Sequence, residues 1–485
     1  MDRYDFDFIV IGGGGAGITA ALTTQGFGKK TAIIERAKLG GECTWTGCVP
    51  SKALIRMSHV YSCAQAMASY DLNEGDNGEN SVLPPLQVMK HVRKIQKKVY
   101  NAETPEVFEK RGIKVIEGEA KFENAHSIVV NGKKFTANKF IIATGSAPMV
   151  PKIEGLEEAG YYTNQSIFNI DALPKTITCI GGGPISMELA QAFNNLGVSV
   201  TVIQRSDILK NEDKELVGAF KKKLMESGVT LKTGVSPVNV MQVGSNKILK
   251  LKDSSGAETQ VKTEAILVAT GRVPNVEGLQ PENAGVEFDK HGIKVDKFLR
   301  TSVKNIYAIG DVVGPYRFSH IAEYHGAIAA LNALLPIKRK VNYDNIIWVN
   351  FTDPEIAHLG LTEEQARDKY GSKLKIFKYE YKDLDRAVTD IEEFGFIKVI
   401  CDRHYRVLGA HIIGHQAGEL IHQLQIVKSF KIKFTKLSSL IYAYPTFSDL
   451  VRKPGKIAYL DMVQSNPAVK FARMFAKKKK TTAED

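Results

Sequence analysis

Cys43 and Cys48 are separated by four residues, in the run Gly40-Gly41-Glu42-Cys43-Thr44-Trp45-Thr46-Gly47-Cys48-Val49-Pro50-Ser51-Lys52. A disulfide between such close neighbours removes little entropy from the unfolded chain, so it would be a poor structural staple. The same small ring opens and closes with the transfer of two electrons. Five cysteines in 485 residues do not form the dense framework of a secreted scaffold. We therefore interpret the pair as a redox couple.

Composition limits the remaining classes of function. The length is sufficient for about three domains with full cores. The net charge of +12 is most simply a solvated basic surface, and attraction to an anionic cofactor is a second explanation. No nucleic-acid-binding module is visible, so we expect no nucleic-acid partner, and we expect no resident metal. The first residues lead into a strand without a signal peptide, which predicts a cytoplasmic protein.

Two segments have a biased composition. Residues 74–85 are polar and predict a loop. Near the end of the sequence, Phe471, Met474 and Phe475 have helical spacing and precede the basic run 477–480. Such a segment could lie on a membrane surface, but we favour a docked or frayed tail.

A glycine-rich turn follows the first apolar run. Residues 8–11 predict a strand, Gly12-Gly13-Gly14-Gly15-Ala16-Gly17 a turn and 18–26 a helix, and a second strand over 31–34 is followed by Glu35. In this pattern the first glycine makes the turn, the second admits a pyrophosphate and the third lets helix and strand pack closely. Glu35 stands where a carboxylate can accept hydrogen bonds from a ribose. The combination predicts a dinucleotide-binding unit.

The same pattern recurs later in the chain. Residues 176–180 predict a strand, Gly181-Gly182-Gly183-Pro184-Ile185-Ser186 a turn, 187–196 a helix and 199–203 the next strand. Ser186 replaces the third glycine and is still small. The second strand is followed by Gln204-Arg205-Ser206 and not by an acid. An acid would favour the ribose hydroxyl of NAD, whereas an arginine can pair with a 2′-phosphate, so we predict NADPH over NADH.

Later strands end in small turns that suit a nucleotide domain. The runs 141–145 and 267–271 are near copies that end in Ala-Thr-Gly, and 306–311 ends in Gly-Asp. From about residue 345 the sequence changes to mixed strand-like and helical runs, which predicts a separate α+β domain: 346–351, 396–400, 407–413 and 419–430.

Together these residues resemble the pyridine nucleotide-disulfide oxidoreductases with an N-terminal redox disulfide, the family of dihydrolipoyl dehydrogenase, glutathione reductase and mercuric reductase. The resemblance extends from about residue 4 to about residue 460. It implies an α/β fold with two Rossmann-like dinucleotide-binding domains, for FAD and NAD(P), and a C-terminal α+β dimerisation domain. The implied boundaries are 1–150 for the first part of the FAD-binding domain with the redox disulfide, 151–275 for the NAD(P)-binding domain, 276–345 for the return of the FAD-binding domain, 346–465 for the dimerisation domain and 466–485 for a basic tail.

The resemblance also implies two cofactors. FAD would lie on the first glycine turn, with Glu35 on its ribose and Asp311 on its ribityl chain, and NADPH on the second, with NADH as the alternative. The hydride would pass from nicotinamide to flavin, and the electrons then to the disulfide. The implied cofactor-binding residues are Gly12, Gly14, Gly15, Ala16, Gly17, Glu35, Arg36, Gly41, Glu42, Cys43, Lys52, Gly118, Ala120, Thr144, Gly145, Gly181, Gly183, Pro184, Ile185, Glu188, Gln204, Arg205, Gly271 and Asp311.

Catalytic roles follow from the same resemblance. Cys48 would lie against the flavin as the charge-transfer thiolate, and Cys43 would be the interchange thiol that meets the acceptor. A helix N-terminus and a nearby cation lower the pKa of a thiol, which increases the reactive thiolate. Lys52 lies one helical turn after Cys48, reaches the flavin in this family, and would pair with Glu188.

One segment departs from the disulfide reductases of the family. They carry a His-Pro with a Glu five residues after the His, and here Tyr444 and Asp449 occupy those places and complete the candidate catalytic set. A tyrosine has an unperturbed pKa of about 10, so it donates a hydrogen bond but is a poor base at pH 7. His411 and His415 lie outside the motif and are interpreted as ordinary polar residues.

This departure counts against dihydrolipoyl dehydrogenase and glutathione reductase. Mercuric reductases carry a tyrosine there and also resemble Asp385-Arg386-Ala387 and the run 395–398, yet they need a C-terminal cysteine pair, and no cysteine follows Cys401. Cys63, Cys179 and Cys401 are isolated and are interpreted as buried or incidental.

We predict a homodimeric FAD-dependent oxidoreductase of the mercuric-reductase-like branch. It would pass electrons from NADPH through FAD to the Cys43–Cys48 couple and on to a small-molecule or metal-ion acceptor. Two alternatives stay open: a dihydrolipoyl dehydrogenase or other disulfide reductase in which Tyr444 substitutes for the histidine, and a non-catalytic flavoprotein that binds a partner or a membrane.

Overall fold

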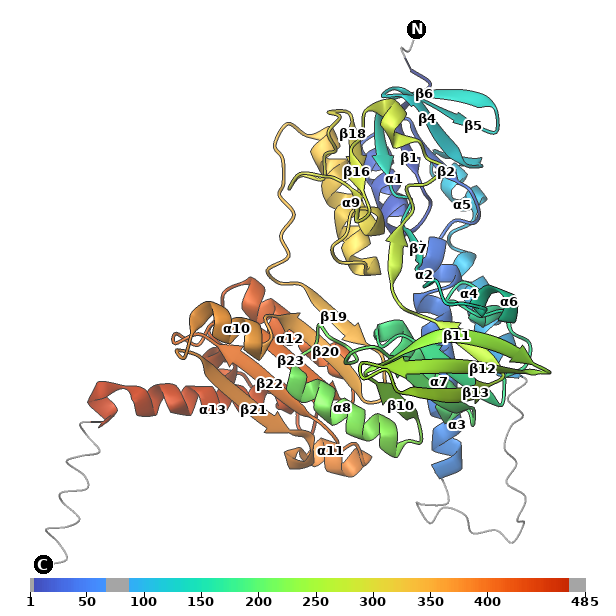
Figure 1. The fold of residues 1–485 in the computed structure, drawn as a ribbon. Coiled ribbons are helices and arrows are strands. Elements are labelled where there is room, and N and C mark those ends of the chain that lie inside the picture. The colour runs from blue at the N-terminus through green and yellow to red at the C-terminus, as the bar shows by residue number, and fades with distance from the viewer. Residues whose placement is uncertain (1–3, 67–86, 471–485) are drawn as a thin grey trace, which may run out of the picture. The chain divides into compact units, whose positions relative to one another are not determined.

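The computed structural model describes residues 4–66 and 87–470 (Figure 1). The chain divides into two compact units. The first unit spans Met1–Ile208 and Ser227–Asn342, and the second spans Leu209–Glu226 and Tyr343–Asp485. The predicted loop over 74–85 and the residues Phe471, Met474, Phe475 and 477–480 lie outside the described residues. The domain boundaries stay a prediction.

The main sheet of the first unit is built around buried apolar strands. β1 (Phe6–Ile11) pairs in parallel with β2 and β6, so that Ile9 lies beside Ala32 and Phe140. Residues 8–11 are all buried, as expected for a parallel strand covered on both faces. The strand order is β3-β2-β1-β6-β5-β4, with β18 also paired to β6. The other strands are β2 (Thr31–Glu35), β3 (Ile113–Glu117), β4 (Ala120–Asn124), β5 (Ser127–Val130), β6 (Lys133–Ile142) and β18 (Ile306–Ala308).

Two helices of this unit cross at very short distance. α1 (Gly15–Gly26) follows β1, and α9 (Ser319–Leu334) packs against it. A Cβ on Gly326 of α9 would lie 2.5 Å from the backbone oxygen of Ala16, so the crossing requires glycine. A Cβ on Gly15 would lie 3.7 Å from Glu323. The close crossing therefore holds α9 beside the first glycine turn.

A second parallel sheet repeats the strand–turn–helix pattern. β8 (Thr176–Ile180), α7 (Pro184–Asn195) and β9 (Ser199–Gln204) follow one another as predicted, and proline occupies the first turn of α7, where its fixed φ suits a helix start. The strand order is β10-β9-β8-β14, and a separate antiparallel sheet has the order β11-β12-β13. The bounds are β10 (Thr230–Thr233), β11 (Val235–Val243), β12 (Asn246–Asp253), β13 (Glu258–Thr263) and β14 (Ala265–Val268).

The segment with the two cysteines is helical. α3 (Cys48–Ala66) packs against α4 and α7, which fixes it within the unit. The remaining elements of the unit are α2 (Gly41–Trp45), α4 (Val88–Tyr100), α5 (Pro105–Lys110), α6 (Leu156–Ala159), β7 (Ser146–Pro148), β15 (Arg272–Pro274), β16 (Phe288–Asp289), β17 (Gly292–Ile293), η3 (Ile167–Asn169), η4 (Pro281–Ala284) and η5 (Gly310–Val312).

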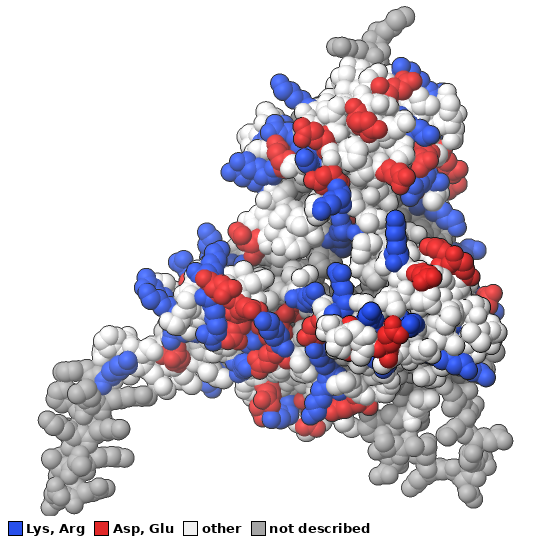
Figure 2. All heavy atoms as spheres, viewed as in Figure 1, with Lys and Arg blue, Asp and Glu red and all other residues white. Residues whose placement is uncertain are grey.

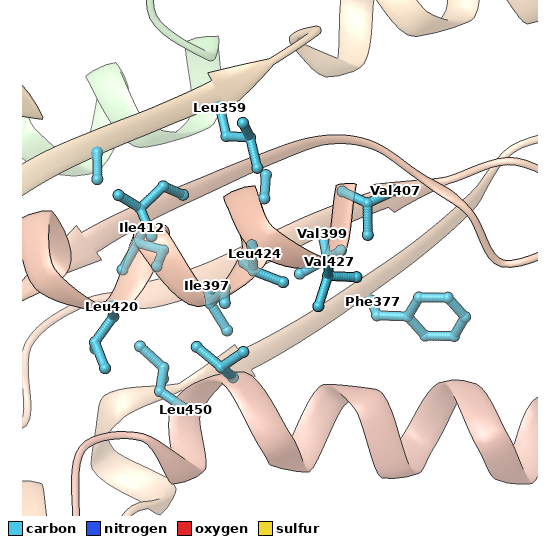
Figure 3. Packing of buried hydrophobic residues seen from close by; sticks show 14 of the residues in the cluster. Leu359, Phe377, Ile397, Val399, Val407, Ile412, Leu420, Leu424, Val427 and Leu450 are labelled. Carbon is cyan, nitrogen blue, oxygen red and sulfur yellow. The ribbon is translucent and has the colours of Figure 1, made fainter. Parts of the chain in front are cut away.

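The second unit is an antiparallel sheet with helices, as predicted for an α+β domain. The sheet order is β19-β20-β23-β22-β21. Figure 3 shows its apolar face, where Leu359, Ile397, Val399 and Ile412 lie with Leu420 and Leu424 of α12 and Leu450 of α13 in one buried cluster. The bounds are β19 (Ile347–Asn350), β20 (Glu355–Gly360), β21 (Lys375–Glu380), β22 (Phe396–Cys401), β23 (Val407–Gly414), α8 (Lys214–Glu226), α10 (Glu363–Tyr370), α11 (Asp385–Asp390), α12 (Ala417–Ser429), α13 (Asp449–Ser465), η6 (Tyr381–Asp383) and η7 (Phe434–Ser439).

The same sheet carries a row of polar side chains, one on each strand. In strand order they are Trp348, His358, His411, Lys398 and Lys378. They alternate along their strands with the apolar residues and therefore belong to the opposite face. The turn before α8 supplies acids to this row: Trp348 Nε1 donates to Glu212 at 2.6 Å, and Lys398 Nζ lies 2.6 Å from Asp213. This hydrogen bond and this ion pair tie the start of α8 to the sheet of the second unit.

Candidate redox site and cofactor-binding loops

Cys43 and Cys48 lie at the junction of two helices. Cys43 is in α2, and Cys48 is the first residue of α3, where the positive end of the helix dipole favours a thiolate. Both are half-buried free thiols. A hydrogen bond between them lowers the pKa of Cys48 to about 6, burial opposes this effect, and Ser319 and Lys52 reinforce it. The same bond and burial raise the pKa of Cys43. The acidic thiol of the pair is therefore Cys48.

Lys52 and Glu188 form an ion pair next to Cys48. Lys52 Nζ donates to Glu188 Oε2 at 2.8 Å, although the residues are 136 positions apart in sequence. Glu188 is nearly buried in α7, and Lys52 follows Cys48 by one turn of α3. The structure thus brings together the lysine and the glutamate that the sequence proposed as partners.

Ser319 is a residue of this site that the sequence analysis did not identify. It is the first residue of α9, and its hydroxyl lies 3.2 Å from Cys48 Sγ. A serine at the start of a helix is ordinarily interpreted as a cap. The local sequence around Ser319 therefore did not predict its contact with Cys48, which lies 271 residues earlier in the chain.

The first glycine turn has the shape of a phosphate cradle. A Cβ on Gly12 would lie 2.2 Å from the Ala143 oxygen, and one on Gly17 would lie 1.9 Å from the Gly12 oxygen, so both glycines are required by packing. A Cβ on Gly14 would meet nothing closer than 3.9 Å, which leaves its backbone open to a ligand. Glu35, the last residue of β2, accepts a hydrogen bond from the Gly13 N–H at 2.6 Å. These residues fit the pyrophosphate and ribose of a dinucleotide.

The other predicted residues around this turn follow the strands of the same sheet. Gly118 follows β3, and its N–H donates to the Glu35 oxygen at 2.8 Å. Arg36 is exposed and pairs with Glu119 at 3.3 Å. The carboxyl ends of parallel strands meet at one edge of a sheet, where open α/β sheets bind ligands. The remaining predicted residues are Ala16 in α1, Gly41 in α2, Ala120 at the start of β4, Thr144 and Gly145 after β6, and Asp311 after β18.

A half-buried arginine connects two of the predicted residues, Glu42 and Asp311. Arg272 forms an ion pair with Glu42, and its Nε donates to Ser146 Oγ at 2.7 Å. The Ser146 hydroxyl in turn donates to Asp311 at 2.7 Å. The sequence analysis missed Arg272 and Ser146. Ser146 and Arg272 directly follow the first and the second Ala-Thr-Gly turn. These equivalent positions in the two near copies were the signal that could have identified them.

The second glycine turn has the same form. A Cβ on Gly181 would lie 2.3 Å from the Ala269 oxygen, whereas one on Gly183 would meet nothing within 4 Å. Ser186 is fully buried in α7, so a small side chain suffices in place of the third glycine. α7 begins with Pro184 and Ile185. Gly271 comes shortly after β14, the strand that pairs with β8, and has a φ of 145°. This turn also fits a dinucleotide.

Arg205 lies directly after β9 and is exposed, and the Gln204 side chain donates to Ser206 Oγ at 3.1 Å. β9 ends in Gln204 and not in a carboxylate, and Asp207 follows three residues later in the same loop.

Tyr444 and Asp449 belong to the second unit, and each of them hydrogen-bonds to a different residue. The Tyr444 hydroxyl, on a side chain exposed to solvent, donates to Asp385 at 2.8 Å, and this bond raises the pKa of Tyr444. Asp449 is buried and accepts from Arg452 Nε at 2.6 Å. Asp385 is therefore the carboxylate that orients Tyr444.

The two histidines and three cysteines that the sequence analysis set aside have local partners or are buried. His411 is buried, and burial lowers its pKa to about 3, while His415 lies 3.4 Å from Glu392. Cys179 and Cys401 are buried, and Cys63 is exposed on α3. Figure 2 shows lysine and arginine interspersed with aspartate and glutamate on the face in view, in agreement with a solvated mixed surface. None of the helices described over 4–66 and 87–470 has the length and apolar character of a membrane-spanning segment.

Comparisons with known proteins agree with this geometry. Residues 6–330 match the family model of pyridine nucleotide-disulphide oxidoreductases, and residues 346–454 match the dimerisation domain of the same family. The chain is 36% identical over 450 residues to a mercuric reductase from Bacillus cereus, which covers 92% of this chain and 70% of that protein. It is 31% identical over 462 residues to a dihydrolipoyl dehydrogenase from Geobacillus stearothermophilus, which covers 93% and 95%.

A solved structure is also similar. The Cu(II) complex of the HOCl-induced flavoprotein disulfide reductase RclA from Escherichia coli superposes with a TM-score of 0.84 at 26% identity, covering 94% of this chain and all of that one. The fold, the glycine turns and the matched relatives lead to one conclusion: the chain belongs to the pyridine nucleotide-disulphide oxidoreductases, FAD-dependent enzymes that use NAD(P)H.

Proposed function

We propose that this enzyme takes electrons from NADPH, passes them through bound FAD to the Cys43–Cys48 pair and delivers them to a small-molecule or metal-ion acceptor. The observation that supports this most is the position of the acidic Cys48 thiol, one helical turn before the Lys52–Glu188 ion pair. Two electrons and one proton would convert the disulfide into a Cys43 thiol and a Cys48 thiolate. Lys52 would keep a positive charge beside that thiolate, and Glu188 would hold Lys52 in place.

The cofactor roles remain those expected from the sequence. Bound FAD supplies two-electron transfer between the nicotinamide and the disulfide. Glu35 would hold its ribose and Asp311 its ribityl chain, while the open backbone at Gly14 would approach the pyrophosphate. Arg205 at the second site supports NADPH over NADH. A family dimerisation domain over 346–454 supports a homodimer.

The acceptor is proposed to be a metal ion or a quinone and not a disulfide. Tyr444 replaces the histidine base of the disulfide reductases, and its bond to Asp385 raises the pKa of a phenol that is already protonated at neutral pH. The relatives include a mercuric reductase, and a similar reductase was solved as a Cu(II) complex. The second candidate is a disulfide reductase, which the 31% identity to a dihydrolipoyl dehydrogenase favours.

Anaerobic stopped-flow spectroscopy of the holoenzyme separates these candidates. The enzyme is reduced with NADPH and mixed with Hg(II), Cu(II), a quinone, lipoamide or glutathione disulfide, and reoxidation is followed by the thiolate–flavin absorbance. We expect fast reoxidation by the metal ions or the quinone and slow reoxidation by the disulfides. Fast reoxidation by lipoamide or glutathione disulfide would instead establish the disulfide reductase.

Cysteine variants test the route of the electrons. Cys43→Ser and Cys48→Ser should lose acceptor reduction, because neither variant can form the redox disulfide. Cys63→Ser is the matched control, since Cys63 is an exposed thiol on the same helix. Wild-type acceptor reduction in both active-site variants would show that the proposal is wrong.

A further inference from the structure

The hydroxyl of Ser319 contacts the redox pair at Cys48. Its oxygen lies 3.2 Å from Cys48 Sγ, within hydrogen-bond range for sulfur. Ser319 is half-buried and belongs to α9, whose position beside α1 is fixed by the close crossing at Gly326. The hydroxyl therefore reaches Cys48 from a helix whose position is fixed by packing and that lies far away in the sequence.

Helix capping does not explain this serine. A capping serine precedes the first helical residue and accepts hydrogen bonds from backbone N–H groups of the first turn. Here Phe318 occupies the cap position, and Ser319 is already inside the helix. The Ser319 hydroxyl hydrogen-bonds to Cys48 instead.

We infer that Ser319 is a further functional residue of the redox site, whose hydroxyl donates to the Cys48 thiolate and keeps the charge of the reduced pair on that sulfur. The inference rests on the proposed function. A thiolate accepts a charge-assisted hydrogen bond, which is stronger than a neutral one, whereas the sulfur of a disulfide is a weak acceptor. The bond therefore favours the state reached when two electrons and one proton open the disulfide to a Cys43 thiol and a Cys48 thiolate.

The charged groups around the redox pair have opposite effects on the stability of the thiolate. Lys52 on α3 stabilises its thiolate, and Glu188 on α7 opposes it. Glu103, after α4, disfavours a negative charge on Cys43. Ser319 is a neutral group whose effect depends on a hydrogen bond and not on net charge, so its removal can be distinguished from theirs by low sensitivity to salt.

The test is a pH titration of the reduced holoenzyme, followed by the thiolate–flavin absorbance. Ser319→Ala should raise the apparent pKa of Cys48 by about one unit, which is a tenfold loss of thiolate below the pKa. The thiol–disulfide equilibrium, measured against a dithiothreitol redox buffer, should shift tenfold toward the disulfide, or about 30 mV for this two-electron couple. Ser319→Thr keeps the hydroxyl and should titrate like the wild type.

Two further variants complete the design. Ser58→Ala removes a hydroxyl that donates only to the Ile55 oxygen at 2.8 Å in the same helix as Cys48, and it should leave the titration unchanged. Valine has nearly the shape of threonine but no hydroxyl. Ser319→Val therefore replaces Ser319→Ala if the alanine variant does not fold. An unchanged pKa in a folded, FAD-containing Ser319→Ala or Ser319→Val variant would overturn the inference. The titration needs no acceptor, so failure of the proposed function would appear separately, as acceptor reduction that survives Cys43→Ser and Cys48→Ser.

Discussion

Replacing Lys398 by methionine should strongly lower the free energy of unfolding of the second unit. The Lys398 side chain is 2% exposed, and its ammonium group lies 2.6 Å from Asp213, 3.0 Å from Glu363 and 3.1 Å from Glu215. Methionine fills much of the same volume but leaves the buried Asp213 carboxylate without its cation. Removing one partner of a buried ion pair costs about 3–5 kcal/mol, and we expect a loss of unfolding free energy of that size.

The pH dependence of this loss follows from Asp213. Burial is the largest single effect and raises the pKa of Asp213, but the hydrogen bond with Lys398, the Lys398 charge and the other groups around the carboxylate together hold the pKa below the ordinary value. A carboxyl with a depressed pKa contributes stability above its unfolded pKa, and this contribution is lost as the pH falls. Without Lys398 the pKa of Asp213 is raised, so Lys398→Met should differ least from the wild type in acid, where Asp213 becomes neutral.

Tryptophan fluorescence during urea unfolding measures the change. The chain has two tryptophans, and Trp348 belongs to the polar row of the second unit, so a Trp45→Phe background makes it the single reporter. Lys378→Met is the matched control, because Lys378 pairs with the same Glu215 from the neighbouring strand but is 44% exposed. An exposed pair contributes about 0–1 kcal/mol.

Two results would refute this reasoning. The first is an equal loss of less than about 1 kcal/mol in Lys398→Met and Lys378→Met, because burial would then not be the source of the cost. The second is a double variant, Lys398→Met with Asp213→Asn, that is no more stable than Lys398→Met. A neutral amide needs no cation, so part of the lost stability should return.

Three more predictions concern the first unit. Lys52→Met should raise the pKa of Cys48 and Glu188→Gln should lower it, because the two charges act on the thiolate with opposite signs; pH titration of the reduced enzyme should show shifts in opposite directions. Burial lowers the pKa of His325 to about 4. Between about pH 6.5 and pH 4 the unfolded chain therefore binds a proton at this histidine that the folded chain does not, and the free energy of unfolding should fall by about 2 kcal/mol from pH 7.5 to pH 5. The melting temperature of His325→Asn should fall less over the same range. Arg205→Ala should raise the KM for NADPH about tenfold or more, the cost of one charge-assisted hydrogen bond, and leave the KM for NADH unchanged in steady-state kinetics.

The sequence was informative where local pattern determines structure. Continuous apolar runs such as residues 8–11 and 176–180 predicted buried parallel strands, and both glycine turns were located because tight turns restrict residue type. The element ends differ by a few residues: α1 begins at Gly15 and α7 at Pro184, a turn earlier than the apolar spacing suggested. The first helical turn contains the glycines and proline that a propensity argument assigns to the preceding loop.

The sequence was uninformative where contacts are long-range. α8 follows β9 like an ordinary crossover helix, and the partners that tie it to the second sheet, Lys398 and His358, come about 150–180 residues later. Ser319 and Arg272 are polar residues at ordinary positions, and their contacts with Cys48 and Glu42 depend on how distant segments pack. No local periodicity encodes such pairs, so only the folded chain identifies them.

Tyr444 illustrates the difference between a motif position and a chemical role. By position, Tyr444 and Asp449 correspond to the histidine and glutamate of the disulfide reductases, but Asp449 bonds to Arg452 and the partner of Tyr444 is Asp385. A histidine held by a carboxylate becomes a better base, because the carboxylate stabilises the imidazolium. A tyrosine that donates to a carboxylate becomes a weaker acid and keeps its proton at neutral pH. Under the proposed function, this exchange of partners leaves no base for disulfide exchange, whereas an acceptor that takes electrons without proton transfer at this position loses nothing.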